Sequence, residues 1–255
     1  EDFNMIEISK ISKRYQDTTV LDNITTTIQR GGITSIIGPN GAGKSTLLSV
    51  IGRLLMPESG MVSVNGMDVA ATESDVLAKN LSILRQENQF VSRLTVEELV
   101  GFGRYPYSKG RLTLEDKKVI DESLDFLNLT EFRHRYLDEL SGGQRQRTYV
   151  AMVLCQDTEY VMLDEPLNNL DMKHAVIMMK LLRKAADELG KTIIIVIHDI
   201  NFASVYSDYI LAMRNGQLYY HGSPKEIMKS DIIEDIFDTP VDVKELDDKL
   251  IAMYY

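Results

Sequence analysis

The chain has 255 residues, of which 44% are hydrophobic and 26% are charged, a composition typical of a globular protein with one large core or a core and a lobe. The longest aliphatic run, Ile193–Ile197, is far shorter than the ~20 residues that a membrane-spanning helix needs. The net charge of −10 argues against general binding to nucleic acids or anionic lipids, so membrane association is expected only through a protein partner. The one cysteine, Cys155, excludes an internal disulfide, fits a reducing cytosol and is most simply a small buried residue.

The first predicted elements are strands. Early apolar runs indicate a small antiparallel layer, and they span Met5–Ile11, Val20–Ile28 and Met61–Val64. Three other runs lack polar alternation and therefore indicate buried parallel strands: Ser35–Ile37, Val161–Leu163 and Ile193–Ile197. Ligands bind at the carboxyl ends of such strands, so the residues that follow them are candidates for a site.

A nucleotide-binding loop (the P-loop) follows the first buried strand. It reads Gly38-Pro39-Asn40-Gly41-Ala42-Gly43-Lys44-Ser45, continues with Thr46, and opens a predicted helix with apolar residues Leu47, Leu48, Ile51, Leu54 and Leu55 on one face. The glycines let the backbone approach phosphates, Lys44 reaches the terminal phosphates, and the Ser45 hydroxyl can bind Mg²⁺. Such a pattern arises by chance in only about one chain in a hundred of this length. A dinucleotide-binding loop is disfavoured, because the third glycine of that fingerprint is missing.

Helical spacing replaces the strand pattern between Gln86 and Tyr160 and predicts an inserted helical lobe. Within it lies the glycine-rich turn Leu140-Ser141-Gly142-Gly143-Gln144, here called the signature turn, which opens a predicted helix from Gln144 to Leu154. The free N–H groups and the positive dipole end of that helix favour an anion. The chain thus has two elements that favour phosphate, the P-loop and the signature turn, but only the P-loop is a nucleotide-binding loop. The simplest explanation is that the signature turn of a second copy closes the nucleotide site.

Two carboxylates, Asp164 and Glu165, end the second buried strand. Asp164 is expected to hold Mg²⁺ through water beside Ser45, and Glu165 is expected to polarise the attacking water. His198 ends the third buried strand and is expected near the same sheet edge, although the residues alone fit an ordinary loop histidine equally well. The next residue, Asp199, is expected to cap a helix.

The later part of the chain contains a strong hairpin signal. Asn215-Gly216 lies between the apolar runs Tyr209–Met213 and Gln217–His221. We expect a three-part organisation: residues 1–87 as the first part of a nucleotide-binding core, 88–158 as a helical subdomain, and 159–255 as the second part of the core.

A signature turn downstream of a P-loop makes the chain resemble the nucleotide-binding subunit of an ATP-binding-cassette (ABC) transporter. The resemblance implies that Tyr15 stacks on adenine and that Gln86 reaches Mg²⁺ and links the two lobes. It implies that His198 is the switch histidine, which contacts the γ-phosphate and the attacking water. Asn168-Asn169-Leu170-Asp171 matches the D-loop, with Asp171 in the expected place, although the family commonly has serine where Asn168 stands.

The fold implied by the resemblance is an α/β P-loop NTPase (RecA-like) core with an antiparallel β layer and an inserted α-helical subdomain. The implied activity is ATP hydrolysis coupled to transmembrane transport, with ATP and Mg²⁺ as the bound groups. The nucleotide is expected to contact Tyr15, the P-loop with Thr46, residues Ser141, Gly142, Gly143 and Gln144 of a partner, and Asp171. The expected metal ligands are Ser45, Gln86 and Asp164, and the expected catalytic residues are Lys44, Gln86, Glu165 and His198.

The resemblance also implies partners and a location. A second copy of the chain would form a head-to-tail dimer with two sandwiched ATP molecules, and no nucleic acid is expected to bind. Integral membrane permease subunits would dock between the lobes, near Gln86 and the loop after it, and a substrate-binding protein would act indirectly. The chain is therefore expected as a peripheral protein at the cytoplasmic face of the cell membrane.

Four stretches are similar to the importer branch that serves ferric siderophores, haem and cobalamin: Gly103-Arg104-Tyr105-Pro106-Tyr107, Arg145–Met152, His198-Asp199-Ile200-Asn201 and Gly222-Ser223-Pro224. We expect ferric siderophore uptake. The alternatives are zinc or manganese import, haem or cobalamin import, and a soluble ABC ATPase of iron–sulfur assembly. Single residues also have simpler interpretations: Pro106 as a helix breaker, and Arg145 and Arg147 as a solvated helix face.

Overall fold

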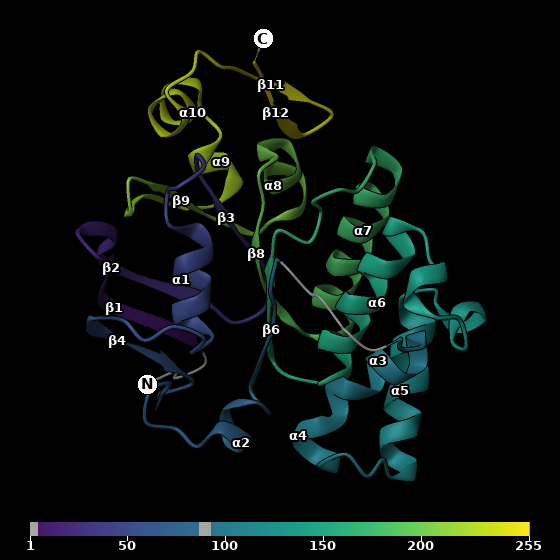
Figure 1. Ribbon diagram of the computed structural model, residues 1–255. Helices are drawn as coiled ribbons and strands as arrows, with labels where there is room; N and C mark the ends of the chain where they lie inside the picture. The colour runs from purple at the N-terminus through teal and green to yellow at the C-terminus, as the bar shows by residue number, and fades with distance from the viewer. Residues whose placement is uncertain (1–4, 87–92, 255) are drawn as a thin grey trace. The chain divides into compact units, whose positions relative to one another are not determined.

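The computed structural model of the protein describes residues 5–86 and 93–254, whose helices and strands are shown in Figure 1. The chain forms two compact units. Glu1–Thr72 and Thr192–Tyr255 make up the first, called the sheet unit, and Glu73–Lys191 makes up the second, called the helical unit. Within the described ranges, no helix is long and apolar enough to cross a membrane. The domain boundary expected after residue 87 and the loop expected after Gln86 lie outside the described residues.

An antiparallel sheet in the sheet unit confirms the predicted β layer. Its strand order is β2-β1-β4-β5, with the bounds β1 (Met5–Tyr15), β2 (Thr18–Gln29), β4 (Ser59–Val64) and β5 (Met67–Asp68). The isoleucines at alternating positions of β1 and β2 are buried, as are Val62 and Val64 of β4. One apolar face therefore packs on the core, which explains the alternating pattern of the sequence.

A second group of strands in the sheet unit is parallel. Strand β3 (Gly32–Ile37) pairs in parallel with β8 (Thr192–Val196) and with β9 (Tyr209–Arg214), and β9 pairs antiparallel with β10 (Gln217–Gly222). Every residue of β8 is buried, which confirms the prediction that its uninterrupted apolar run forms a buried parallel strand. Asn215 (φ 51°) and Gly216 (φ 76°) make the predicted turn, in the left-handed conformation that two-residue hairpins require.

The helix after the P-loop is shorter than its apolar pattern suggested. Helix α1 (Lys44–Ile51) ends at Gly52, and Arg53 has a left-handed φ of 55°. The Arg53 guanidinium donates hydrogen bonds to the carbonyl oxygens of Val69 (3.1 Å) and Thr72. Leu54 and Leu55, expected on one face of this helix, lie beyond its end, and Leu54 is 45% exposed, so this part of the prediction was wrong.

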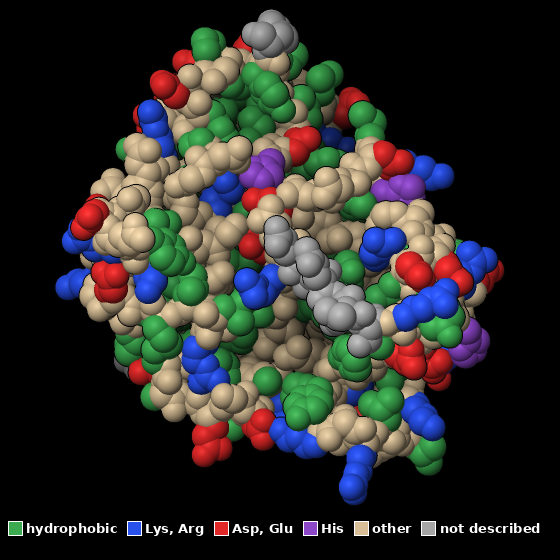
Figure 2. Space-filling model, viewed as in Figure 1, with side chains coloured by type: hydrophobic (Ala, Val, Ile, Leu, Met, Phe, Trp, Pro, Cys, Tyr) green, Lys and Arg blue, Asp and Glu red, His purple; other side chains and the backbone are tan. Residues whose placement is uncertain are grey.

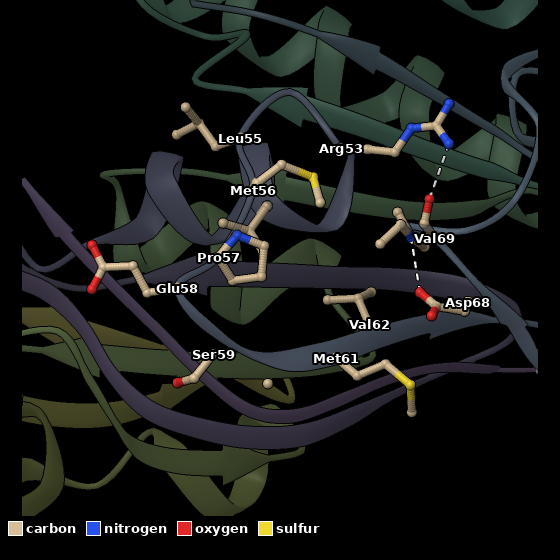
Figure 3. Close-up of a pocket in the computed structure, with 13 residues that line it drawn as sticks. Arg53, Leu55, Met56, Pro57, Glu58, Ser59, Met61, Val62, Asp68 and Val69 are labelled. Atoms are coloured by element: carbon tan, nitrogen blue, oxygen red, sulfur yellow. Dashed lines mark hydrogen bonds between the residues drawn. The ribbon is translucent and has the colours of Figure 1, made fainter.

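A cavity of about 260 Å³ lies beside the end of α1, where Figure 3 shows its lining. The loop residues Met56 and Pro57 face Met61 and Val62 of strand β4. The segment after α1 thus lines a cavity instead of continuing the helix.

The remaining elements of the sheet unit follow β8 and β9. They are α8 (Ile200–Tyr206), α9 (Pro224–Ile227), α10 (Ser230–Phe237) and a hairpin of β11 (Asp242–Leu246) and β12 (Lys249–Met253). This second hairpin was not predicted from the sequence pattern. Its turn is Asp247-Asp248, and both residues have left-handed φ angles, 48° and 62°.

Helices dominate the helical unit, as predicted for the segment before Tyr160. They are α2 (Ser74–Leu77), α3 (Val96–Gly101), α4 (Tyr105–Ser108), α5 (Leu114–Phe126), α6 (Gly142–Cys155) and α7 (Met172–Leu189). Short 3₁₀ turns span Phe102–Arg104, Thr130–Phe132 and Leu137–Glu139. Strands β6 (Leu81–Leu84) and β7 (Tyr160–Asp164) pair in parallel. Helices α3, α5 and α6 pack on one another around Leu124, Leu127 and Leu129, which are fully buried.

A buried ion pair stabilises the interior of the helical unit. Arg104, 6% exposed, donates from Nε to Asp116 (2.9 Å) and from Nη1 to the carbonyl of Cys155 (3.0 Å). Burial disfavours the charged carboxylate, but hydrogen bonds from Thr113 and Arg104 outweigh it and lower the pKa of Asp116. Pro106 lies in the first turn of α4, where proline is tolerated, so it opens a helix rather than breaking one.

The two arginines after the signature turn differ from each other. Arg145 is exposed, and its Nε donates to the carbonyl of Leu137 (3.1 Å). Arg147 is partly buried, and this burial lowers the pKa of its guanidinium. The interpretation of both as one solvated helix face was therefore wrong for Arg147.

Candidate nucleotide site

The P-loop lies between strand β3 and helix α1, the arrangement that the motif requires. Gly38 has a φ of 145°, and a Cβ atom there would lie 2.0 Å from the carbonyl oxygen of Met213. A Cβ atom on Gly43 (φ 96°) would lie 2.7 Å from the carbonyl oxygen of Val20. Both contacts involve backbone atoms, which cannot rotate away. Glycine is therefore required at these two positions to form the loop.

Lys44 lies inside the loop that it follows. Its side chain is 5% exposed, and its ammonium donates to the carbonyl oxygens of Gly38 (2.8 Å) and Pro39 (2.9 Å). The loop therefore holds a positive charge at its centre, where a phosphate group would be attracted. Ser45 and Thr46 follow in the first turn of α1 and bring two hydroxyl groups to the same end of the helix.

Two other expected site residues of the sheet unit are exposed. Tyr15 ends β1 with 46% of its surface accessible, and the ammonium of Lys13 lies 5.7 Å from its ring centroid. An exposed ring of this kind can stack on a flat base. His198 follows β8 and is also exposed. Asp199 caps helix α8 by accepting from the N–H groups of Asn201 (2.8 Å) and Phe202 (3.2 Å), as predicted.

The helical unit brings together three of the residues considered in the sequence analysis. The side-chain amide of Gln86 donates to Oε2 of Glu165 (2.8 Å), and the amide of Asn168 donates to the same oxygen. Glu165 has a φ of 51°, a left-handed conformation that costs about 1–3 kcal/mol and is concentrated at functional sites. Asp164, 8% exposed, is the last residue of β7. Asn168, which replaces the usual serine of the D-loop, thus orients the candidate base.

The signature turn starts helix α6 at Gly142, two residues before the predicted start. The Ser141 hydroxyl accepts from the Gln144 N–H (3.3 Å), and the Gln144 side chain accepts from the Ser141 N–H (2.9 Å). This capping box fixes the turn, and Ser141 and Gly142 are both exposed. The first N–H groups of the 14-residue helix α6 are therefore presented at an accessible surface.

His174, which the sequence analysis missed, connects the D-loop with the signature turn. Its Nδ1 lies 2.7 Å from Oδ1 of Asp171, and its backbone N–H donates to the same oxygen (2.8 Å). These two hydrogen bonds lower the pKa of Asp171. A Cβ atom on Gly143 would lie 2.2 Å from Cδ2 of His174, so the ring fills the space that a side chain would need. The Asp-x-x-His spacing at a helix start is the signal that could have indicated the hydrogen bonds between Asp171 and His174.

The candidate metal ligands have suitable chemistry for Mg²⁺. Ser45, Gln86 and Asp164 all offer oxygen donors, which this hard cation prefers. Among the described residues, no group of three or more His, Cys, Asp or Glu side chains could hold a metal ion. Mg²⁺ in phosphoryl-transfer sites characteristically binds one or two protein groups together with phosphates and waters, so the residues present fit it as a companion of the nucleotide.

Comparisons with known proteins identify the family of the chain. The family model described as "ABC transporter" matches residues 21–168. The petrobactin import ATP-binding protein YclP of Bacillus subtilis is 52% identical over 251 residues, which cover 98% of this chain and 100% of the relative. The petrobactin import ATP-binding protein FatE of Bacillus anthracis is 58% identical over 239 residues, covering 94% and 96%.

A solved structure supports the same assignment. The ATP-binding cassette MJ0796, in a dimeric post-hydrolysis state bound to ADP and Pi, superposes with a TM-score of 0.77 at 29% identity. The match covers 86% of this chain and 98% of that one. The predicted P-loop NTPase fold is thereby confirmed. The chain belongs to the ABC transporter family, as an ATP-binding subunit whose ATPase activity is coupled to transport.

Proposed function

We propose that the chain hydrolyses ATP to energise the uptake of a ferric siderophore through separate permease subunits. The observation that carries this proposal is the match to petrobactin import ATP-binding proteins over nearly the whole of both chains. The four stretches similar to the siderophore, haem and cobalamin branch favour the same cargo. Ferric petrobactin is accordingly the first cargo to test, with zinc, manganese, haem and cobalamin as alternatives.

The proposed chemistry assigns a separate task to each group. Lys44 and the N–H groups of the P-loop hold the phosphates, and Tyr15 stacks on adenine. Mg²⁺, when bound with ATP, neutralises charge on the phosphate oxygens, and Ser45, Gln86 and Asp164 are its proposed ligands.

Glu165 is the proposed base for the attacking water. The amides of Gln86 and Asn168 fix its carboxylate and so favour one orientation toward the water. His198 is proposed to contact the γ-phosphate and the same water. Most of the catalytic effect would come from positioning and charge stabilisation, as is usual for phosphoryl transfer.

The proposed assembly is a head-to-tail dimer in which the signature turn of each copy closes the nucleotide of the other. Ser141 and Gly142 are exposed at the start of α6, so a phosphate held by another molecule could reach the Gly142 N–H and the Ser141 side chain. The similar cassette MJ0796 forms a dimer. For the domains we propose the three-part division into residues 1–87, 88–158 and 159–255.

Apolar side chains on the helical unit support docking of a permease. Figure 2 shows charged side chains of both signs interspersed over the viewed face. By contrast, the segment around α4 exposes large apolar side chains: Phe102 (50%), Tyr105 (60%), Tyr107 (39%), Leu112 (43%) and Leu114 (85%). Exposed apolar groups of this kind mark interaction surfaces. Through such a permease contact the chain would be a peripheral protein at the cytoplasmic face of the membrane.

Deletion of the chain is the direct test of the cargo. Energised uptake of ferric petrobactin should be lost, while capture by the substrate-binding protein stays unchanged, and a Lys44→Ala copy should not restore uptake. Normal uptake of every tested siderophore together with a zinc, manganese, haem or cobalamin defect would refute the siderophore proposal. A pull-down from detergent-solubilised membranes should recover a membrane permease. Recovery of soluble assembly proteins instead would refute the proposal that the chain works with permease subunits.

A further inference from the structure

Helix α8, which begins two residues after His198, is bound to the C-terminal hairpin by side-chain hydrogen bonds. Asn201 accepts from the N–H of Ala252 (2.8 Å) through Oδ1 and donates to the carbonyl of Ala252 (3.1 Å) through Nδ2. The hydroxyl of Ser204 donates to the carbonyl of Leu250 (2.6 Å). These three bonds join the described elements α8 and β12 in one register.

The register follows from two matching periodicities. Asn201 and Ser204 are three residues apart and therefore lie on one face of α8. Leu250 and Ala252 are two residues apart in β12, so their backbone groups lie along one edge of that strand. The other edge of β12 is paired with β11. The Asn201 amide thus takes the place of a neighbouring strand, satisfying both polar groups of a residue that is only 3% exposed.

A cavity lies beside the segment that carries His198. His198 and Ile200 line a cavity of about 230 Å³ whose other walls come from α10, the segment after it, and the chain beyond β12. These walls include Phe237, Val241 and Tyr254. Asp199 caps α8 and Asn201 lies in its first turn, so the cap and the hairpin together hold the backbone next to His198.

We propose that Asn201 is a positioning residue: by fixing the first turn of α8 on β12, it holds His198 in the orientation that ATP hydrolysis requires. The C-terminal hairpin would then take part in turnover, although it contains no residue expected to touch the nucleotide. The proposal rests on the proposed role of His198 in the same reaction. Any effect of Asn201 on turnover must accordingly pass through His198.

A double-mutant cycle with His198→Ala tests this dependence. ATP turnover of the purified full chain is measured for the wild type, Asn201→Ala, His198→Ala and the double variant, at a temperature at which circular dichroism shows all four to be folded. We expect Asn201→Ala to lower kcat on the order of 10-fold, because small misplacements of catalytic groups have effects of this size or larger. KM for ATP should stay within about twofold, since the P-loop is unchanged. In the His198→Ala background, Asn201→Ala should cause no further loss.

Two further variants and a second measurement make the test robust. Ser204→Ala removes one of the three hydrogen bonds and should lower kcat by a smaller factor. If Asn201→Ala does not fold, Ser204→Ala takes its place in the double-mutant cycle. Lys249→Ala is the matched control, because its side chain is exposed on the same strand and should leave kcat unchanged. Hydrogen exchange should become faster at residues 198–207 in Asn201→Ala and remain unchanged at the P-loop.

Each result decides a separate point. Wild-type turnover in His198→Ala would refute the proposed site, and with it this inference. If His198→Ala loses turnover but Asn201→Ala keeps wild-type turnover, the proposed site stands and only the positioning role of Asn201 is refuted. An equal loss caused by Asn201→Ala in both backgrounds would also refute it, because Asn201 would then act on overall stability and not through His198.

Discussion

The P-loop and the signature turn are both glycine-rich and both open a helix, but their surroundings differ. Backbone atoms lie close to two glycines of the P-loop: a Cβ atom on Gly38 would lie 2.0 Å from the carbonyl oxygen of Met213, and one on Gly43 would lie 2.7 Å from that of Val20. The signature turn is open, and a Cβ atom on Gly142 would meet no heavy atom within 4 Å. The three atoms nearest to a Cβ atom on Gly143 all belong to the ring of His174, which is a side chain. The P-loop meets backbone atoms of its own unit, whereas the signature turn presents the N–H group of Gly142 at an exposed surface.

This difference indicates how binding and hydrolysis are divided. In the proposed site the phosphates are bound by the P-loop of one chain, so one chain should bind ATP by itself. We propose that hydrolysis also needs the signature turn, and that this turn comes from another copy. The central claim is therefore that each nucleotide is bound in cis and completed in trans.

The largest expected effect concerns the base. Glu165→Gln keeps the shape and the hydrogen-bonding capacity of the side chain but removes the carboxylate, so turnover should fall by about 100-fold or more. ATP affinity, measured by equilibrium binding, should remain, and an ATP-bound dimer should accumulate on gel filtration. Glu188→Gln, on the exposed end of α7, is the matched control and should hydrolyse ATP normally. Wild-type turnover in Glu165→Gln would show that the base has been assigned to the wrong residue.

Substitutions in the two glycine-rich elements should separate binding from hydrolysis. Gly38→Ala should abolish ATP binding because its methyl group meets the backbone. Ser141→Arg should leave ATP affinity nearly intact and reduce hydrolysis to background, since only the partner's nucleotide meets this residue. Gly142→Ala, in open space, should change both much less than the other two. If Ser141→Arg weakened ATP binding of the monomer as much as Gly38→Ala, the turn would act in cis.

A smaller effect, on stability, is expected inside the helical unit. Arg104→Met leaves Asp116 as a buried carboxylate without its ion pair, which should cost about 3 kcal/mol of unfolding free energy. The folded pKa of Asp116 lies below its unfolded value, so its stabilisation is complete above the unfolded pKa and is lost as pH falls toward the folded one. Arg104→Met should therefore reduce the dependence of stability on pH in the acid range.

Urea unfolding at neutral and acid pH measures both effects. Lys118→Met, which removes an exposed ion pair with Glu122 on helix α5, serves as the control and should hardly change either curve. Equal stability of Arg104→Met and Lys118→Met would show that the buried pair contributes nothing.

The smallest effect is chemical. Burial raises the pKa of the Cys155 thiol to about 11, so the native chain should react with iodoacetamide much more slowly than the urea-unfolded chain at pH 8. Mass spectrometry of the alkylated peptide measures this ratio. Equal rates in the two states would mean that the helical unit opens readily around α6.

Local sequence signals predicted the elements whose structure depends on neighbouring residues. The apolar runs of β3, β7 and β8, the Asn215-Gly216 turn and the Asp199 cap depend on side-chain pattern or backbone preference. The end of α1 was missed because Leu54 and Leu55 continue the helical spacing of apolar residues. The helix ends before them, and the Arg53 side chain donates hydrogen bonds to the carbonyl groups of Val69 and Thr72.

Contacts between distant segments could not be predicted from the sequence. The β11–β12 hairpin has an Asp-Asp turn instead of Asn-Gly, and one of its edges is satisfied by side chains of α8. The contact between His174 and Gly143 joins residues from two helices. For the site itself, the carboxylates at the end of a buried strand indicated Glu165, and the family resemblance indicated Gln86. Only the structure shows that Asn168 donates to the same oxygen of Glu165 as Gln86 does.

Mixed dimers test the central claim most directly. A dimer of Lys44→Ala with Ser141→Arg, isolated through two affinity tags, would contain one site with both defects and one intact site. We predict about half of the wild-type turnover for this dimer, well above either parent homodimer. A dimer of the wild type with the Lys44→Ala, Ser141→Arg double variant has one defect in each site and should be inactive. An inactive first dimer together with a half-active second dimer would contradict the account, because each chain would then complete its own nucleotide site.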